Sequence, residues 1–301
     1  MSEHYPRIRI QARNGTIIVR EGLRLTFYMP PPHQRVVQDV MRALDAYLRN
    51  VGPNALGMYA DDEGEWRELD DQGWSLMRRK LVEKSHPRLI LEAPDISGDY
   101  AFLYRGQDLE VISRMNEPDA MCEATFWLST EFLEEHGPER VRALAIELAL
   151  LLPLCSGACG LAFLGGLDLV GVSRELARYW TRYPGIDISS QSGYSSDVGT
   201  RLRGPHWMNF LGQPVLGELG GAEGLRAKLR SPGTTVQELP GDKVVITLGE
   251  WPEAGDLERG DVLPAYRELA RVLEPWLYQS KVRMLRRPEE ETRRWERRFL
   301  D

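Results

Sequence analysis

"LRLTFYM" at residues 23–29 is followed by three prolines and then by an apolar pattern of helical period. The alternating and aromatic side chains of residues 23–29 favour a strand, which the prolines end. Residues 36–51 then present one apolar face of an amphipathic helix, because their apolar residues recur at three- and four-residue steps. Gly52-Pro53 stops this helix. The stretch therefore predicts a strand, a loop and a helix in series.

The same order of elements recurs twice along the chain. "CEATFWLS" (122–129) precedes a helix over about 138–152 and the strand-like "GLAFLG" (160–165). "KVVITLG" (243–249) precedes a polar loop and a helix over about 263–278. Three such units predict a sheet covered by helices, and the pattern leaves open whether they are a true repeat or ordinary α/β punctuation.

Three hairpins complete the prediction of the fold. Residues 7–13 and 16–21 flank Asn14-Gly15, a pair typical of a type I′ turn. Residues 234–239 pair with 243–249, and residues 99–106 pair with 122–129. We therefore expect an α+β fold with a mixed, largely antiparallel sheet covered by helices, built possibly from repeated strand–helix–strand units.

The chain contains no clear linker. We expect residues 1–280 to form one α+β domain and residues 281–301 to form a charged C-terminal helix or tail. A further helix is expected over 71–84, with Asp70 or Asp71 as its cap.

Composition restricts the class of protein. The formal net charge of −7 over 301 residues disfavours a general nucleic-acid binder, since phosphate binding needs a basic face. The N-terminus carries no secretory pattern, and the most apolar run (143–155) is too short for a membrane span and contains Glu147. Three cysteines fit a reducing compartment. We expect a cytoplasmic protein with no membrane partner, and the oligomeric state stays open.

Motifs for common chemistry are absent from the sequence. It has no phosphate-binding glycine loop, no H-E-x-x-H and no G-x-S-x-G. Cys155 and Cys159 have C-x-x-x-C spacing, but no second cysteine pair exists, and His136 or His206 would join them only through tertiary folding. We expect no metal, no cofactor and no catalytic residue.

One enzymatic alternative depends on His206. It could act as a base oriented by Asp187, with a nucleophile from the serine-rich loop between them. The serines of that loop are Ser189, Ser190, Ser192, Ser195 and Ser196. No spacing supports this arrangement, and a histidine at a strand edge beside a core tryptophan is the simpler interpretation.

An acidic run, "DDEGEWRELDD" (61–71), is the candidate binding surface. It has seven carboxylates and one arginine around Trp66. A solvated loop followed by a helix N-terminus would show the same residues. The functional interpretation is a docking patch for a basic partner, with the tryptophan as an anchor. The candidate partner-binding residues are Asp61, Asp62, Glu63, Glu65, Trp66, Glu68, Asp70 and Asp71.

Several short motifs carry a family resemblance. "RYPGID" (182–187), "RGPHWMNFLG" (203–212) and "LGG" (219–221) resemble the bacterial type VI secretion immunity family, as do "PEAGD" (252–256) and "YRELARVLEP" (266–275). Some members of that family are paired with VRR-NUC-type nuclease effectors. The resemblance covers roughly residues 15–280. Its signature positions, which we interpret as structural, are Tyr183, Pro184, Gly185, Asp187, Gly204, Trp207, Phe210 and Gly212.

The resemblance implies a cytosolic antidote without enzymatic activity. Such a protein binds a cognate secreted toxin, here expected to be a basic nuclease, and blocks its active site or substrate groove. The acidic charge of the chain agrees, since a DNA-gripping nuclease presents a basic surface. The alternatives are an orphan regulatory or scaffold protein without a toxin partner, or a hydrolase that uses His206 and Asp187.

Overall fold

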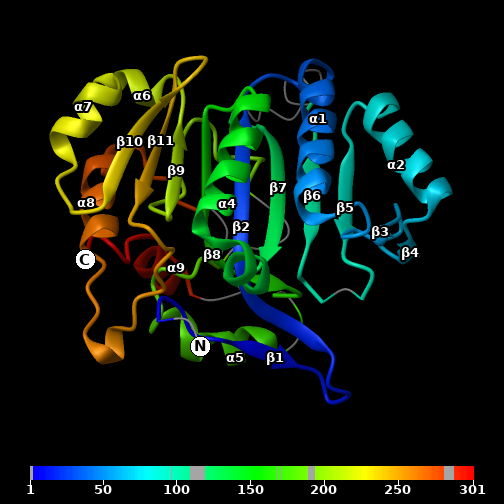
Figure 1. Ribbon diagram of the computed structural model, residues 1–301, viewed down its shortest axis with the longest axis horizontal. Helices are drawn as coiled ribbons and strands as arrows, with labels where there is room; N and C mark the ends of the chain where they lie inside the picture. Colours follow the sequence, from blue (N-terminus) through cyan, green and yellow to red (C-terminus); the bar gives the residue numbers. More distant parts are fainter. Residues whose placement is uncertain are drawn as a thin grey trace.

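The computed structural model describes residues 3–95, 97–108, 119–167, 169, 171–188, 194–280 and 288–301. Its centre is an eleven-stranded sheet with the strand order β10-β11-β9-β8-β2-β7-β6-β5-β3-β4, and β1 adds to one end of β2. Every pair of neighbouring strands runs antiparallel, so the predicted α+β class and the largely antiparallel sheet are confirmed (Figure 1).

The strands are β1 (Arg9–Gln11), β2 (Ile17–Met29), β3 (Met58–Ala60), β4 (Trp66–Glu68), β5 (Arg88–Glu92), β6 (Ala101–Arg105), β7 (Cys122–Ser129), β8 (Ser156–Gly165), β9 (Met208–Leu211), β10 (Thr234–Leu239) and β11 (Lys243–Leu248). The α-helices are α1 (His33–Val51), α2 (Asp71–Glu83), α4 (Thr130–Leu151), α5 (Val172–Trp180), α6 (Val215–Glu218), α7 (Gly221–Lys228), α8 (Pro264–Leu273) and α9 (Glu289–Glu296).

Strand β2 is the central strand and is longer than predicted. It pairs with β7 on one side and with β8 on the other. The sequence prediction divided it into two strands around Gly22, and this division is wrong. Gly22 lies within the strand because a Cβ atom there would come within 2.2 Å of Leu164 Cδ1, so the glycine serves close packing and makes no turn.

One face of the sheet carries the main core. Alternate β2 residues Leu23, Leu25, Phe27 and Met29 are fully buried on this face. Helices α1 and α4 lie side by side across it, and α2 covers its β5 end with Met77 and Leu81 (Figure 1). Packing between these apolar helix stripes and the odd-numbered residues of β2 holds the centre of the fold.

The opposite face is more polar in its middle. The intervening β2 residues Arg24, Thr26 and Tyr28 point there. Farther along, α8 covers Leu211 of β9 and Ile246 of β11. The helices of the first two strand–helix units therefore share one face, and the helix of the third unit lies on the other. This difference argues against three equivalent repeats.

The predicted hairpins form, with one error of turn type. β10 pairs with β11 and β6 pairs with β7, as expected. β1 pairs with β2, but a register shift at Ile10 and Gln11 lengthens the loop between them. Within that loop Gly15 has a positive φ and Asn14 does not, so the predicted type I′ turn is wrong.

The C-terminal helix α9 packs against the rest of the chain. The Trp295 ring stacks on Trp180 with centroids 5.7 Å apart, and Phe299 contacts Tyr266 at 5.4 Å. The division at residue 280 stays a prediction. Among the described helices, none combines the length and the apolar character that crossing a membrane requires.

Candidate functional site

The acidic run lies at one edge of the sheet. Asp61–Glu65 form the turn between β3 and β4, and β4 is the last strand on that side. Helix α2 begins directly afterwards, at Asp71. The topology therefore places all eight candidate partner-binding residues on one hairpin and the first residues after it.

Asp61 organises the turn. Its carboxylate accepts hydrogen bonds from the backbone N–H groups of Glu63 (3.1 Å) and Glu65 (2.8 Å) and from Nε of Arg67 (2.9 Å). The Arg67 hydrogen bond is the main reason that the pKa of Asp61 is lowered. Because its oxygens are engaged within the hairpin, Asp61 contributes more to the shape of the patch than to its free charge.

Two lysines at the C-terminal end of α2 pair with Asp62, a contact that the sequence did not indicate. Nζ of Lys80 lies 2.5 Å from one carboxylate oxygen, and Nζ of Lys84 lies 4.0 Å from the other. The folded hairpin therefore carries less unpaired negative charge than its sequence suggests. An exposed pair of this kind contributes little stability, but it removes one charge from the patch.

Asp70 caps α2 by accepting a hydrogen bond from the Gly73 N–H at 2.7 Å, so the expected helix and its cap are confirmed. Four carboxylates remain exposed and form no ion pair within the part of the chain that the structure describes. They are Glu63, Glu65, Glu68 and Asp71. Trp66 between them is half-buried.

The hairpin turn stands between two clefts. One has a volume of about 370 Å³ and lies against Tyr59, Leu76 and Met77 of the α2 side. The other, of about 540 Å³, is lined by Trp66 and Ile90 together with basic and acidic side chains. Asp61, Asp62 and Glu63 border both clefts, so the predicted patch is the ridge between two concave surfaces.

The first signature stretch packs against another segment that carries the resemblance. The Gly185 N–H donates to the Ala254 carbonyl at 2.8 Å, and a Cβ atom at Gly185 would lie 2.0 Å from the Glu253 carbonyl oxygen. Ile186 N–H closes a turn onto Tyr183, with Pro184 in between. Gly185 lacks the positive φ of a type II turn, so close backbone approach is what requires this glycine.

The second signature stretch forms β9, between β8 and β11. Trp207, Met208, Phe210 and Leu211 are fully buried. Gly204 has a φ of 112°, and a Cβ atom at Gly212 would lie 2.8 Å from the Leu154 carbonyl oxygen. The two glycines allow the backbone to take these positions, and the four apolar side chains fill the core.

The two stretches meet at a buried cluster around Asp187. The Arg203 guanidinium donates two hydrogen bonds to the Asp187 carboxylate, at 3.0 and 3.3 Å, and an Arg298 nitrogen lies 3.9 Å away. Burial alone would raise the pKa of Asp187, but Arg203, His206 and Arg298 hold it well below its usual value. Asp187 is therefore ionised at neutral pH.

His206 lies beside Asp187, as the hydrolase alternative requires, but its orientation does not fit catalysis. Its Nδ1 lies 2.9 Å from the Gly204 carbonyl oxygen and must donate to it, because a carbonyl only accepts. Its Nε2 faces Asp187 at 3.5 Å. The two ring nitrogens thus face the Gly204 carbonyl and the Asp187 carboxylate, rather than a serine that the structure describes.

The serines of that alternative do not assemble with the histidine in the described structure. Ser189, Ser190 and Ser192 lie outside the described residues. Ser195 is buried and its carbonyl accepts from Met121 N–H, while Ser196 is exposed.

The three cysteines, Cys122, Cys155 and Cys159, are free and buried. Burial raises the pKa of the Cys155 thiol to about 11, so the thiol stays protonated. No group of three or more metal-ligating side chains occurs among the described residues.

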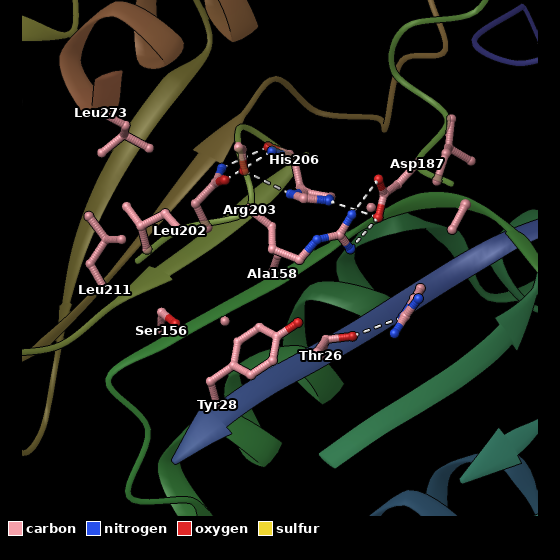
Figure 2. Close-up of a pocket in the computed structure, with 17 residues that line it drawn as sticks. Thr26, Tyr28, Ser156, Ala158, Asp187, Leu202, Arg203, His206, Leu211 and Leu273 are labelled. Carbon is pink, nitrogen blue, oxygen red and sulfur yellow. Dashed lines mark hydrogen bonds and ion pairs between the residues drawn. The ribbon is translucent and has the colours of Figure 1, made fainter. Parts of the chain in front are cut away.

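A small pocket of mixed polar and apolar lining lies next to the Asp187 cluster (Figure 2). Thr26 and Tyr28 of β2 line one side, and Arg203 and His206 line the other. Its volume is about 30 Å³, enough for two or so water molecules and too small for a substrate of ordinary size.

Arg203 and Arg298 are the members of this cluster that sequence reasoning missed. Arg203 opens the quoted motif at 203–212, but a sequence does not show which arginine pairs with Asp187. Arg298 belongs to the C-terminal segment outside the resemblance, and nothing in its charged surroundings indicated that it is buried beside Asp187.

Comparison with known proteins gives one family match and one solved structure of the same fold. A family model described as TsiV, type VI immunity for VRR-NUC, matches residues 39–299. The solved structure of the Pseudomonas aeruginosa T6SS protein PA0821 is similar, with a TM-score of 0.79 and 21% identity over 97% of this chain and 87% of that one. At that identity the likeness shows a shared fold. No curated protein matches the sequence.

Proposed function

The chain belongs to the TsiV family of type VI immunity proteins for VRR-NUC, and from this membership we propose that it binds a VRR-NUC nuclease effector and blocks its active site or DNA groove. The family match over residues 39–299 is the observation that carries the proposal. We also propose that it acts in the cytoplasm, where an incoming nuclease would reach the chromosome, and that it has no catalytic activity of its own.

Electrostatics supports a nuclease partner. A nuclease that holds a phosphodiester backbone presents a basic groove. This chain has a net charge of −7, and opposite charges on two partners accelerate their association. The charge argument therefore favours a basic effector surface, although it does not select one effector.

We propose that the β3–β4 hairpin is the docking surface, with Asp61, Asp62, Glu63, Glu65, Trp66, Glu68, Asp70 and Asp71 as its residues. Glu63, Glu65 and Glu68 supply exposed charge, and the half-buried Trp66 offers apolar area beside the larger cleft. Asp61 and Asp70 hold the backbone that presents them. Tryptophan is enriched among the few residues that carry most of the binding energy of an interface.

The backbone of β4 strengthens this choice. The Asp61 N–H donates to the Glu65 carbonyl, and the Leu69 N–H donates to the Gly57 carbonyl. Because hydrogen-bonded and non-hydrogen-bonded pairs alternate along an antiparallel ladder, the N–H and C=O groups of Trp66 and Glu68 face away from β3. The Glu68 carbonyl oxygen lies against α2, since a Cβ atom at Gly73 would come within 2.9 Å of it, so we propose Trp66 as the main pairing position. An extended segment of the effector can add to this edge, and basic side chains on it would meet the glutamates.

The opposite edge of the sheet is protected. Nε and Nη2 of Arg226 donate to the Val236 carbonyl of β10, at 3.3 and 3.1 Å, and Nη1 pairs with Glu238 at 2.9 Å. Natural sheets commonly block an edge that must not pair. Among the described residues no arginine caps the β4 edge in this way, and its acidic side chains would repel a second copy of itself while accepting a basic strand.

Co-expression tests the proposal. The nuclease encoded beside this chain's gene should kill a host cell alone and should be neutralised when this chain is present. Purified proteins should form a stable complex in which DNA cleavage stops. A toxic neighbour that is neither bound nor neutralised would contradict the proposal for that pair. Absence of any effector gene beside this chain would instead favour the orphan regulatory alternative.

A further inference from the structure

The pocket beside Asp187 contains two polar side chains, Tyr28 and Arg24, that the proposed immunity role does not use. Its floor is the back face of β2 and β8, and Arg203 with His206 forms its roof (Figure 2). The volume of about 30 Å³ admits a group of a few heavy atoms. Any occupant must therefore be small, and its chemistry must match the polar atoms that face it.

Tyr28 supplies an unpaired donor. Its side chain lines the pocket and is 4% exposed, and its hydroxyl has no hydrogen-bond partner. Buried hydroxyls without a partner are rare because they lose their bonds to water. Burial raises the pKa of Tyr28 well above its ordinary value, so the phenol keeps its proton and acts as a donor.

Arg24 supplies a second donor and a positive charge. Its Nε donates to Thr26 Oγ1 at 3.0 Å, and its Nη2 reaches Glu123 at 3.4 Å. Its Nη1 bonds no described residue. Arg24 is 9% exposed, so this nitrogen is available mainly to something within the pocket. An arginine donates to oxygen acceptors and accepts nothing, which points to an anionic or carbonyl occupant.

Arg203 adds charge from the other side of the pocket. It is bound to Asp187 and lies over the Tyr194 ring at 4.0 Å, so its position is fixed. Arg24 and Arg203 both line the pocket, the first paired with Glu123 and the second with Asp187.

We propose that the pocket binds one small oxyanion, of carboxylate or phosphate size, held by Arg24, the Tyr28 hydroxyl and the Arg203 charge. Its oxygens would accept from the Tyr28 hydroxyl and from Nη1 of Arg24, the two donors that bond no described residue. The oxyanion is either a free inorganic ion or the carboxylate of an acidic side chain from a bound protein. Binding of a free inorganic ion does not depend on the proposed immunity role.

Calorimetric titration of the purified chain with inorganic phosphate, at constant ionic strength, tests the free ion. The wild type should bind one equivalent, and Tyr28→Phe, which removes only the hydroxyl, should bind at least tenfold more weakly. Arg24→Lys, which keeps the charge but loses the fork, should also bind more weakly. Arg42→Gln, an exposed arginine on α1, should bind like the wild type.

The second source is tested with the neighbouring nuclease. If phosphate does not bind but Tyr28→Phe weakens the nuclease complex tenfold while its thermal unfolding midpoint is unchanged, the carboxylate comes from the partner. If Tyr28→Phe alters neither phosphate binding nor the complex, the pocket holds only water and the proposal is overturned. If the wild type does not bind the nuclease, only the immunity role is contradicted. The phosphate titration then tests alone whether the pocket binds an oxyanion.

Discussion

The Arg203 guanidinium grips the Asp187 carboxylate through two hydrogen bonds, at 3.0 and 3.3 Å, inside the protein. Asp187 is 3% exposed, so this pair joins the two signature stretches inside the protein. Replacing one partner leaves the other charge buried and unpaired, which costs far more than a surface pair is worth.

Asp187→Asn should therefore lower the free energy of unfolding by about 3 to 5 kcal/mol in urea titrations. The depressed pKa of Asp187 stabilises the fold fully above its ordinary value of 3.8, and this contribution is lost as the pH falls below that value. The variant should consequently lose less stability on acidification than the wild type. Asp45→Asn, whose pair with Arg78 is half-exposed, is the control and should change stability by at most about 1 kcal/mol.

Glu92 has the opposite pH dependence. It is 3% exposed, and burial raises its pKa from 4.5 to about 7. The folded state thus holds a proton that the unfolded state has lost, so stability falls as the pH rises from about 4.5 to 7 and stays reduced above it. Glu92→Gln should remove this loss and stabilise the protein by up to about 3 kcal/mol at pH 8. Equal stability of the two proteins at pH 8 would show that Glu92 is solvated.

Gly185→Ala should separate the two segments that meet at this glycine. Its Cβ would lie 2.0 Å from the Glu253 carbonyl oxygen, and backbone atoms cannot yield as a flexible side chain does. We expect a loss of about 1 to 3 kcal/mol in the free energy of unfolding. Gly217→Ala is the matched control, because its Cβ would meet only the flexible Gln213 amide.

Arg226→Ala should expose the β10 edge. The loss of its hydrogen bonds to Val236 leaves a strand edge ready to pair with another molecule. Analytical ultracentrifugation at rising protein concentration should show more self-association for this variant than for Arg271→Ala, an exposed arginine on α8. Identical sedimentation of the two variants would mean that Arg226 does not guard the edge.

Charge reversal of Glu63, Glu65 and Glu68 to lysine should slow association with the nuclease about tenfold or more at low salt, and less at high salt. These three carboxylates have no ion-pair partner among the described residues, so folding stability should change little. A control with Glu135, Glu139 and Glu175 reversed has the same net charge on other surfaces. Equal association rates for the two triple variants would remove the hairpin from the interface.

Local patterns predicted much of the fold. The helical period after residue 36 predicted α1, the likeness of 122–129 to the aromatic strand at 23–29 predicted β7, and Asp70 was recognisable as a helix cap. These features depend on neighbours within a few residues, which a single sequence displays directly. The Gly22 error has the same origin, because the reason for that glycine is Leu164, far away in the chain.

The candidate sites were less predictable. The acidic run was visible as a composition, but the pairing of Asp62 with Lys80 depends on how α2 folds back along the hairpin. Asp187 and His206 were matched correctly as neighbours, while Arg203 and Arg298 were missed. Whether an arginine is a solvated surface charge or a buried counter-ion is decided by tertiary packing, which residue spacing does not encode.

The central position of β2 determines how long a newly made chain takes to fold. Its partners are residues 122–129 and 156–165, so the strand emerges from the ribosome long before it can pair on either side. At about 5 to 20 residues per second, β8 follows β2 by several seconds or more. Long-range antiparallel pairing of this kind also folds slowly. Under the proposed immunity role, a cell would therefore rely on molecules that have already folded when the toxin arrives, because newly made chains need this time before β2 is paired.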